Sequence, residues 1–222
     1  MDLDVTPVFD KIYDKTNEEW KILVLRGGTR SSKTRSMLQC IMIRLISGKF
    51  WDIQKDKGIF SIYRKHKATL KTTVMRDFNE IIDQHGLWNF IEANKTDRTY
   101  ICGERMVEFQ WADDQQKLRG SKRNFLYCNG ANELQYKEEF FQLLIRTKDR
   151  VILDFNPSDE DIRINTEIEQ KRMHENKDVA LIVSTYKDNP FLSEWEIEEV
   201  ENIQNIDPYL RQVYWLWGYG KV

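Results

Sequence analysis

The sequence predicts an α/β domain in which a mostly parallel sheet is flanked by helices. Short apolar runs, each about the length of one strand, recur along the chain and alternate with longer segments that have apolar residues at helical spacing. Strands that alternate with helices are typical of a parallel sheet, since each helix carries the chain back across one face of the sheet. The 222 residues contain no internal repeat and no low-complexity linker, so one domain is expected.

Each expected element is bounded by glycine, proline or polar turn residues. The expected strands are Lys21–Leu25, Ile59–Tyr63, Phe125–Cys128, Val151–Phe155 and Ala180–Thr185, with a hairpin of Tyr100–Cys102 and Met106–Trp111 around Gly103-Glu104. The expected helices are Thr34–Ser47, Thr69–Gln84, Tyr136–Ile145, Ile162–His174, Glu194–Gln204 and Pro208–Trp215. The first twenty residues suit either a helical arm or a flap.

Composition and charge exclude several classes of protein. The formal net charge is -2, so the whole domain is not a basic nucleic-acid binder, and a DNA contact would need a local basic patch. The three cysteines show no spacing typical of disulfide pairs or metal sites, which predicts reduced core cysteines of an intracellular protein. The three histidines are far apart in the sequence, so no metal site built on them is expected. No segment is long and apolar enough to span a membrane, and the N-terminus has no signal-peptide core.

The strongest chemical signal is a glycine-rich loop between the first expected strand and the first expected helix. Its sequence is Gly27-Gly28-Thr29-Arg30-Ser31-Ser32-Lys33-Thr34. In this setting the backbone N–H groups and the helix N-terminus form the anion site of a P-loop. Lys33 would reach the β- and γ-phosphates of ATP, and Thr34 would place its hydroxyl on Mg²⁺. Ser32 stands where the usual pattern has glycine, so a positive φ costs more there.

Several segments resemble, in the same order, those of the large terminase subunits of bacteriophages. Arg30 within the loop, with Ser32 in place of glycine, is similar to the deviant Walker A motif of that family. The later segments that resemble the family are Tyr63-Arg64-Lys65, Lys117-Leu118-Arg119-Gly120, Ala131-Asn132-Glu133-Leu134, Asp154-Phe155-Asn156-Pro157 and Thr185-Tyr186-Lys187-Asp188-Asn189-Pro190-Phe191-Leu192. The resemblance extends from about Leu23 to Gly220, and the ordered set is much more specific than the loop alone.

The resemblance implies a P-loop NTPase fold of the ASCE type with a small C-terminal helical lid, and ATP and Mg²⁺ as cofactors. It implies a motor that translocates double-stranded DNA into the procapsid, with the portal protein and the small terminase subunit as partners. We expect a homo-oligomeric ring on the capsid, a monomeric isolated domain, and a location in the host cytoplasm and transiently at the portal vertex. Residues 1–190 would form the ATPase core with an N-terminal arm, and residues 191–222 a lid or linker. The nuclease domain of the family, and DNA cleavage, are not expected in this chain.

The resemblance also implies roles for individual polar residues. Arg30 would act on the transferring phosphoryl group from within the loop. Arg119 would reach the nucleotide of a neighbouring subunit, or would be a solvated side chain of a loop rich in lysine and arginine. Asn156 would couple the state of the γ-phosphate to movement, or would cap a turn. Arg64 would contact nucleotide or DNA, and the basic stretch after it is either a DNA contact or a solvated face.

The chain departs from the family pattern at the Walker B position. The family has two acidic residues after an apolar strand, whereas here Phe125–Cys128 is followed by Asn129 and Gly130. Asn129 would hold a metal-bound water by its carbonyl oxygen, but Gly130 has no side chain that could act as a base. Either Gly130 replaces the catalytic glutamate and hydrolysis is slow, or Glu133 or Asp154 supplies the carboxylate. The resemblance favours the first alternative, because the family already has its own glutamate at the position of Glu133.

Three other functions remain as alternatives. The first is a P-loop helicase or translocase of another class, which paired core domains would favour and a single domain disfavours. The late motifs also fit terminases better. A nucleotide-binding module without turnover is compatible with the Asn129-Gly130 pair. A small-molecule kinase would need an acceptor-substrate site, for which the sequence offers no candidate motif.

Overall fold

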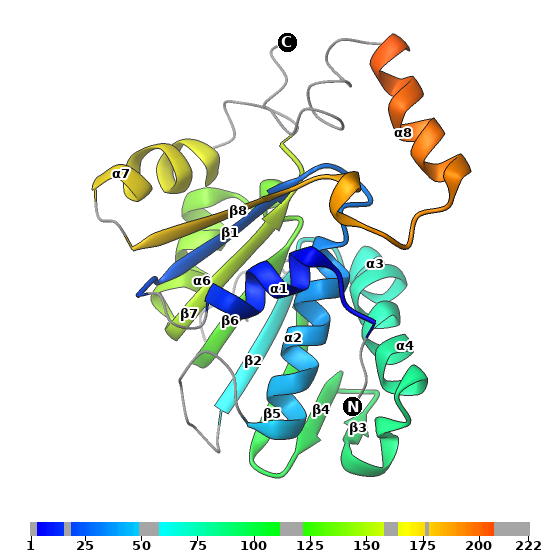
Figure 1. The fold of residues 1–222 in the computed structure, drawn as a ribbon. Coiled ribbons are helices and arrows are strands. Elements are labelled where there is room, and N and C mark those ends of the chain that lie inside the picture. Colours follow the sequence, from blue (N-terminus) through cyan, green and yellow to red (C-terminus); the bar gives the residue numbers. More distant parts are fainter. Residues whose placement is uncertain are drawn as a thin grey trace.

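An eight-stranded sheet forms the centre of the computed structural model (Figure 1). Its strands are β1 (Ile22–Gly27), β2 (Gly58–Arg64), β3 (Glu92–Asn94), β4 (Thr99–Cys102), β5 (Arg105–Trp111), β6 (Arg123–Asn129), β7 (Thr147–Phe155) and β8 (Val179–Ser184). Their order across the sheet is β3-β4-β5-β2-β6-β7-β1-β8. From β5 to β8 in this order all pairs are parallel, and β3 and β4 add an antiparallel edge. The predicted mostly parallel sheet is confirmed.

The structure describes residues 4–15, 19–48, 58–111, 122–157, 164–175 and 178–206. Arg119, with the segment around it, lies outside these residues, and so does the helix expected over 208–215. The lid or linker expected over 191–222 is described as far as residue 206.

Helical segments connect the strands. They are α1 (Pro7–Asp14), α2 (Lys33–Ser47), α3 (Lys67–Leu70), η2 (Lys71–Met75), α4 (Arg76–Gln84), η3 (Leu87–Phe90), η4 (Ala131–Glu133), η5 (Tyr136–Phe140), α6 (Phe141–Ile145), η6 (Asn165–Arg172), α7 (Met173–Glu175), η7 (Tyr186–Asp188) and α8 (Glu194–Ile206). Within the described residues, a helical segment is found wherever the sequence predicted one. The N-terminal segment, for which the sequence left two alternatives, contains the helix α1.

Two hydrophobic clusters cover the two faces of the sheet. In β1, Leu23 and Leu25 belong to the cluster that includes residues of α1, α2 and α4, which lie together on one face in Figure 1. Ile22 and Val24 belong to the second cluster, with Phe140 of η5 and residues of α6 and η6. Successive side chains of a strand point to opposite faces, so an unbroken apolar strand is buried on both sides.

The carboxyl ends of four neighbouring parallel strands meet at one edge of the sheet. β2 ends at Arg64, β6 at Asn129, β7 at Phe155 and β1 at Gly27. Ligands of open α/β sheets bind in the crevice outside these ends. The fold therefore brings the glycine-rich loop, the Walker B position and the segment after β7 to one place.

Candidate functional site

The glycine-rich loop lies between β1 and α2 and is fixed at both ends. At its start, Gly27 is paired with Ser184 of β8, and a Cβ added to Gly27 would lie 2.1 Å from the Ser184 carbonyl oxygen. At its end, Ser32 precedes α2 with a φ of 62°, in the left-handed region that favours glycine. The hydroxyl of Thr6 is hydrogen-bonded to the hydroxyls of Ser32 and Ser36, each at 2.9 Å. The N-terminal segment thus holds the serine that replaces glycine, a contact that the sequence did not predict.

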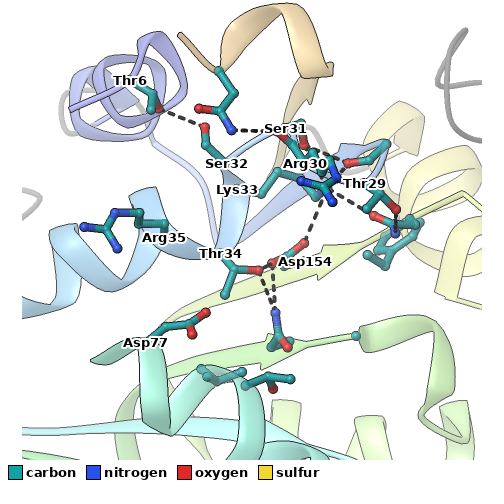
Figure 2. A pocket seen from close by; sticks show the side chains of 18 of the residues that line it. Thr6, Thr29, Arg30, Ser31, Ser32, Lys33, Thr34, Arg35, Asp77 and Asp154 are labelled. Atoms are coloured by element: carbon teal, nitrogen blue, oxygen red, sulfur yellow. Dashed lines mark hydrogen bonds and ion pairs between the residues drawn. The ribbon is translucent and has the colours of Figure 1, made fainter. Parts of the chain in front are cut away.

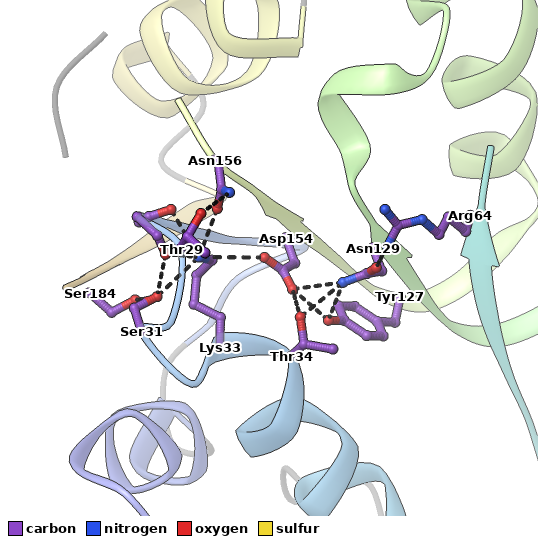
Figure 3. Close-up of polar contacts among 12 residues, drawn as sticks. Thr29, Ser31, Lys33, Thr34, Arg64, Tyr127, Asn129, Asp154, Asn156 and Ser184 are labelled. Atoms are coloured by element: carbon purple, nitrogen blue, oxygen red, sulfur yellow. Dashed lines mark hydrogen bonds and ion pairs between the residues drawn. The ribbon is translucent and has the colours of Figure 1, made fainter. Parts of the chain in front are cut away.

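Lys33 is buried, and its ammonium group is folded back onto the loop (Figures 2 and 3). Its Nζ, with three N–H donors, lies within hydrogen-bond distance of four oxygen atoms: Gly27 O (2.9 Å), Gly28 O (3.0 Å), Ser31 Oγ (3.1 Å) and Asn156 Oδ1 (3.2 Å). Burial lowers the pKa of Lys33 from its usual 10.5, and the nearby charge of Asp154, at 4.0 Å, partly offsets this effect. The ammonium is therefore held close to the place where phosphates would bind.

A pocket of about 730 Å³ opens at this edge of the sheet (Figure 2). Its volume is within the range of roughly 300–1,000 Å³ that small-molecule sites occupy. The pocket is lined by most of the sequence-predicted site residues: Gly28, Thr29, Arg30, Ser31, Ser32, Lys33, Thr34, Arg64, Asn129, Gly130, Glu133 and Asn156. Gly27 lies at the strand end behind the loop, and the position of Arg119 is not described.

Asp154, close to the end of β7, is the centre of a buried hydrogen-bond cluster (Figure 3). Its Oδ2 accepts from Thr34 Oγ1 (2.8 Å), Tyr127 OH (2.7 Å) and Asn129 Nδ2 (3.0 Å). Burial raises the pKa of the Tyr127 phenol well above its usual value, and the negative charge of Asp154 acts in the same direction. Tyr127 therefore stays protonated and donates to the carboxylate. The sequence named Asp154 as one possible carboxylate and did not predict Tyr127.

Asn129 does not face the loop as a carbonyl acceptor. Its Oδ1 accepts a hydrogen bond from Arg64, and its amide nitrogen donates to Thr34 Oγ1 at 3.0 Å. In this orientation the oxygen expected to hold a metal-bound water is directed toward the Arg64 guanidinium. Next in the chain, Gly130 has a φ of 68°, and a Cβ added to it would lie 3.5 Å from Glu133 Oε1. Glu133 thus reaches the space beside the missing side chain, and its Oε1 is 3.6 Å from the Arg64 guanidinium.

Two predicted residues connect the loop to later parts of the chain. Asn156, just after β7, accepts from Lys33 and donates to Thr29 Oγ1 at 3.2 Å. Arg30 forms an ion pair with Glu196 of α8, and its carbonyl oxygen accepts from Asn189 Nδ2 at 2.9 Å. No motif in the sequence pointed to Glu196, since the contact depends on how α8 is placed against the loop.

The described residues contain no cluster of three or more histidine, cysteine, aspartate or glutamate side chains that could hold a metal ion. A cation here would need oxygen atoms from a bound phosphate ligand beside those of the protein. This is how Mg²⁺ is commonly bound in nucleotide sites, by one or two protein oxygens together with the phosphates. Over the same part of the chain, no helix has both the length and the apolar character needed to cross a membrane.

Solved structures of phage terminases share this fold. The large terminase of a thermophilic bacteriophage matches with a TM-score of 0.78 and 14% identity, over 99% of this chain and 54% of that one. The ATPase domain of the Thermus phage P74-26 large terminase matches with a TM-score of 0.64 and 12% identity, over 95% of this chain and 92% of that one. The chain spans about half the length of the first of these proteins.

The family comparison covers most of the sequence. The family described as phage terminase large subunit matches residues 19–216, which include the glycine-rich loop, the Walker B position and the segment after β7. A search of curated proteins gives no match. With the family match over most of the residues and a site built at the expected edge of the sheet, this chain belongs to the phage terminase large subunit family.

Proposed function

We propose that this chain is the ATP-binding and ATP-hydrolysing motor domain of a large terminase, which translocates double-stranded DNA into the procapsid. The observation that carries the proposal is the arrangement of Lys33 and Thr34 in a nucleotide-sized pocket, beside the buried carboxylate of Asp154. The large terminase of the thermophilic bacteriophage has been solved in complex with ADP and with ATP-gamma-S, which supports a nucleotide ligand for the same fold.

Phosphate binding would exchange the partners of Lys33. Its ammonium group now donates to neutral carbonyl, hydroxyl and amide oxygens. Phosphate oxygens carry full negative charge and form stronger, charge-assisted hydrogen bonds, so they would compete successfully for this donor. The backbone N–H groups of the loop and of the first turn of α2 would bind the remaining phosphate oxygens. We assign phosphate binding to residues 27–34 on this basis.

The Thr34 hydroxyl is the group of the loop that would hold Mg²⁺. A bound Mg²⁺ would supply positive charge that offsets the negative charge developing on the transferring phosphoryl group. The groups around Thr34 suit such a hard cation, because a hydroxyl and a carboxylate oxygen lie 2.8 Å apart there.

For activation of the attacking water we propose Glu133. Its carboxylate lines the pocket and lies beside the place that a side chain of Gly130 would enter. The Glu133 side chain is 36% exposed, so water can reach it. A general base contributes on the order of 10²–10⁴-fold in rate.

The second candidate function is a nucleotide-binding module with slow turnover, which is favoured by the absence of any side chain at Gly130.

The remaining polar residues have roles that the family suggests. Arg30 would turn from Glu196 to the γ-phosphate, and Arg64 would act beside the nucleotide from the end of β2. Asn156, which contacts both Lys33 and Thr29, is suited to sense whether the γ-phosphate is present. Arg119 would serve the nucleotide of a neighbouring subunit.

The partners that we propose also follow from the family. They are double-stranded DNA, the portal protein and the small terminase subunit, with the motor acting as a homo-oligomeric ring on the procapsid in the host cytoplasm. Away from the portal we expect mainly monomer at micromolar concentration, since the portal that would organise the ring is absent. Sedimentation velocity measures this directly, and a stable ring under these conditions would contradict the expectation.

The proposal is tested by nucleotide binding to the Lys33→Ala variant. We expect this variant to lose binding of a fluorescent ATP analogue, because the buried cation of the loop is removed. Lys171→Ala is the matched control: Lys171 is exposed, pairs with Glu167 on the surface, and should be replaceable without effect on binding. Unchanged affinity in Lys33→Ala, with both variants folded, would reject the P-loop assignment.

A further inference from the structure

We propose that Asp154, on β7, supplies the carboxylate of the Mg²⁺ site that the family pattern places at the end of β6. The inference rests on the proposed function, since it concerns how the same pocket holds a metal–nucleotide complex. Asn129 occupies the position where the family has its first acidic residue. A neutral amide cannot provide the negative charge that supports a cation and its bound water. In this chain the negative charge lies on the neighbouring strand.

The register of the sheet explains how the carboxylate can change strands without leaving the site. β6 and β7 are parallel neighbours, and Asn129 is paired with Asp154. Paired residues on adjacent strands direct their side chains to the same face of a sheet, so both reach the start of α2. Asp154 is also paired with Leu25 of β1, the strand that leads into the loop. β7 is therefore one strand closer to the loop than β6.

The match of donors and acceptors fixes the role of each side chain (Figure 3). The Thr34 hydroxyl gives its one proton to Asp154 Oδ2 and accepts from Asn129 Nδ2. If the amide of Asn129 were turned over, its oxygen would face the Asp154 carboxylate and its NH₂ would face the guanidinium of Arg64. Neither of those contacts pairs a donor with an acceptor. Asn129 therefore acts as a donor that positions Thr34 and Asp154, while Asp154 provides the charge.

The other acidic side chains of the pocket do not offer an alternative. In the described part of the chain they are Asp4, Asp77 and Glu133. None of the hydrogen bonds found there joins one of these three to Thr34, whereas Asp154 accepts from Thr34 at 2.8 Å. Asp154 is also 3% exposed, so its charge is little screened by solvent and acts strongly on a cation nearby. Burial and hydrogen bonding thus single out one carboxylate.

The test compares how nucleotide affinity responds to Mg²⁺ in Asp154→Asn and in the wild-type protein. Binding of a fluorescent ADP analogue is titrated from EDTA through increasing Mg²⁺, and Mn²⁺ bound together with ADP is counted by electron paramagnetic resonance. We expect the Mg²⁺ concentration for half of the affinity gain to rise about 10–100-fold in Asp154→Asn. Affinity in EDTA should not fall, because the substitution removes a negative charge near Lys33 and leaves the loop's own phosphate donors in place. The exchange variant Asn129→Asp/Asp154→Asn should regain the Mg²⁺ response, because the paired position faces the same site.

Asp149→Asn is the matched control, since it makes the same change in β7 but outside the pocket, where Asp149 accepts from Asn124. Its Mg²⁺ response should equal that of the wild type. A wild-type Mg²⁺ response in Asp154→Asn would overturn the inference. If Asp154→Asn does not fold, the inference is tested with the exchange variant Asn129→Asp/Asp154→Asn. A folded exchange variant whose nucleotide affinity does not respond to Mg²⁺ would contradict the inference that paired positions of β6 and β7 serve the same site. Failure of the wild-type protein to bind nucleotide at all would instead contradict the proposed function.

Discussion

Replacing Glu133 by glutamine removes a negative charge beside Gly130 and, with it, the ion pair between Glu133 and Arg64. Glutamine keeps the length of the side chain, and the Glu133 side chain is 36% exposed, so folding should be preserved. If Glu133 polarises the attacking water, kcat for ATP should fall by about 10²–10⁴-fold, the usual contribution of a general base. Nucleotide affinity should stay near the wild-type value, because Lys33 and Thr34 are untouched. Steady-state phosphate release and analogue binding measure the two effects separately.

The companion variant Gly130→Glu places a carboxylate at the Walker B position itself. Gly130 has a φ of 68°, and a non-glycine residue held in the left-handed region costs on the order of 1–3 kcal/mol. The new Cβ would also lie 3.5 Å from Glu133 Oε1, so two carboxylates would be brought close together. We therefore expect a lower melting temperature and no gain in turnover. A gain of about 10²-fold in Gly130→Glu, with Glu133→Gln unaffected, would refute the role of Glu133 and support loss of the base at Gly130.

Three further predictions concern the loop and its contacts. Burial lowers the pKa of Lys33 from 10.5, so its charge is lost at a lower pH than that of an exposed lysine. Phosphates bind the protonated form, so ATP-analogue affinity should fall as the pH rises toward 10.5. Constant affinity over that range would contradict this prediction. Gly27→Ala should lower the free energy of unfolding, measured in urea, by about 3 kcal/mol or more, because its Cβ would overlap the Ser184 carbonyl oxygen. Stability close to that of the wild type would show that β1 and β8 can move apart. Glu196→Gln should raise affinity for ATP-gamma-S, because Arg30 loses the carboxylate that holds it; calorimetry that finds reduced affinity would show that the pair helps to form the site.

Most of the sheet could be predicted from the sequence, because its inner strands contain continuous apolar runs that are buried on both faces, and the edge strand β8 is an apolar run as well. β1, β2, β6, β7 and β8 all occur where such runs were found. β3 was not predicted, since Glu92–Asn94 is a short, exposed edge strand without an apolar pattern. The glycine-rich loop was predictable because its chemistry is contiguous in sequence.

The rest of the site depends on contacts between segments that are distant in the chain. That Asp154 bonds to Thr34 follows from the pairing of β7 between β1 and β6, which sequence spacing does not reveal. The orientation of the Asn129 amide likewise depends on Arg64, which comes from another strand. For the same reason, no pattern in the sequence indicated the contact between Thr6 and Ser32.

The central claim, that the pocket at the carboxyl ends of these strands hydrolyses ATP, is tested most directly by phosphate release. Wild-type protein and Lys33→Ala are compared at high protein concentration, with Mg²⁺ and with EDTA. We predict Mg²⁺-dependent phosphate release by the wild type that is absent in Lys33→Ala and in EDTA. Equal release by the two proteins, with both folded, would contradict the claim.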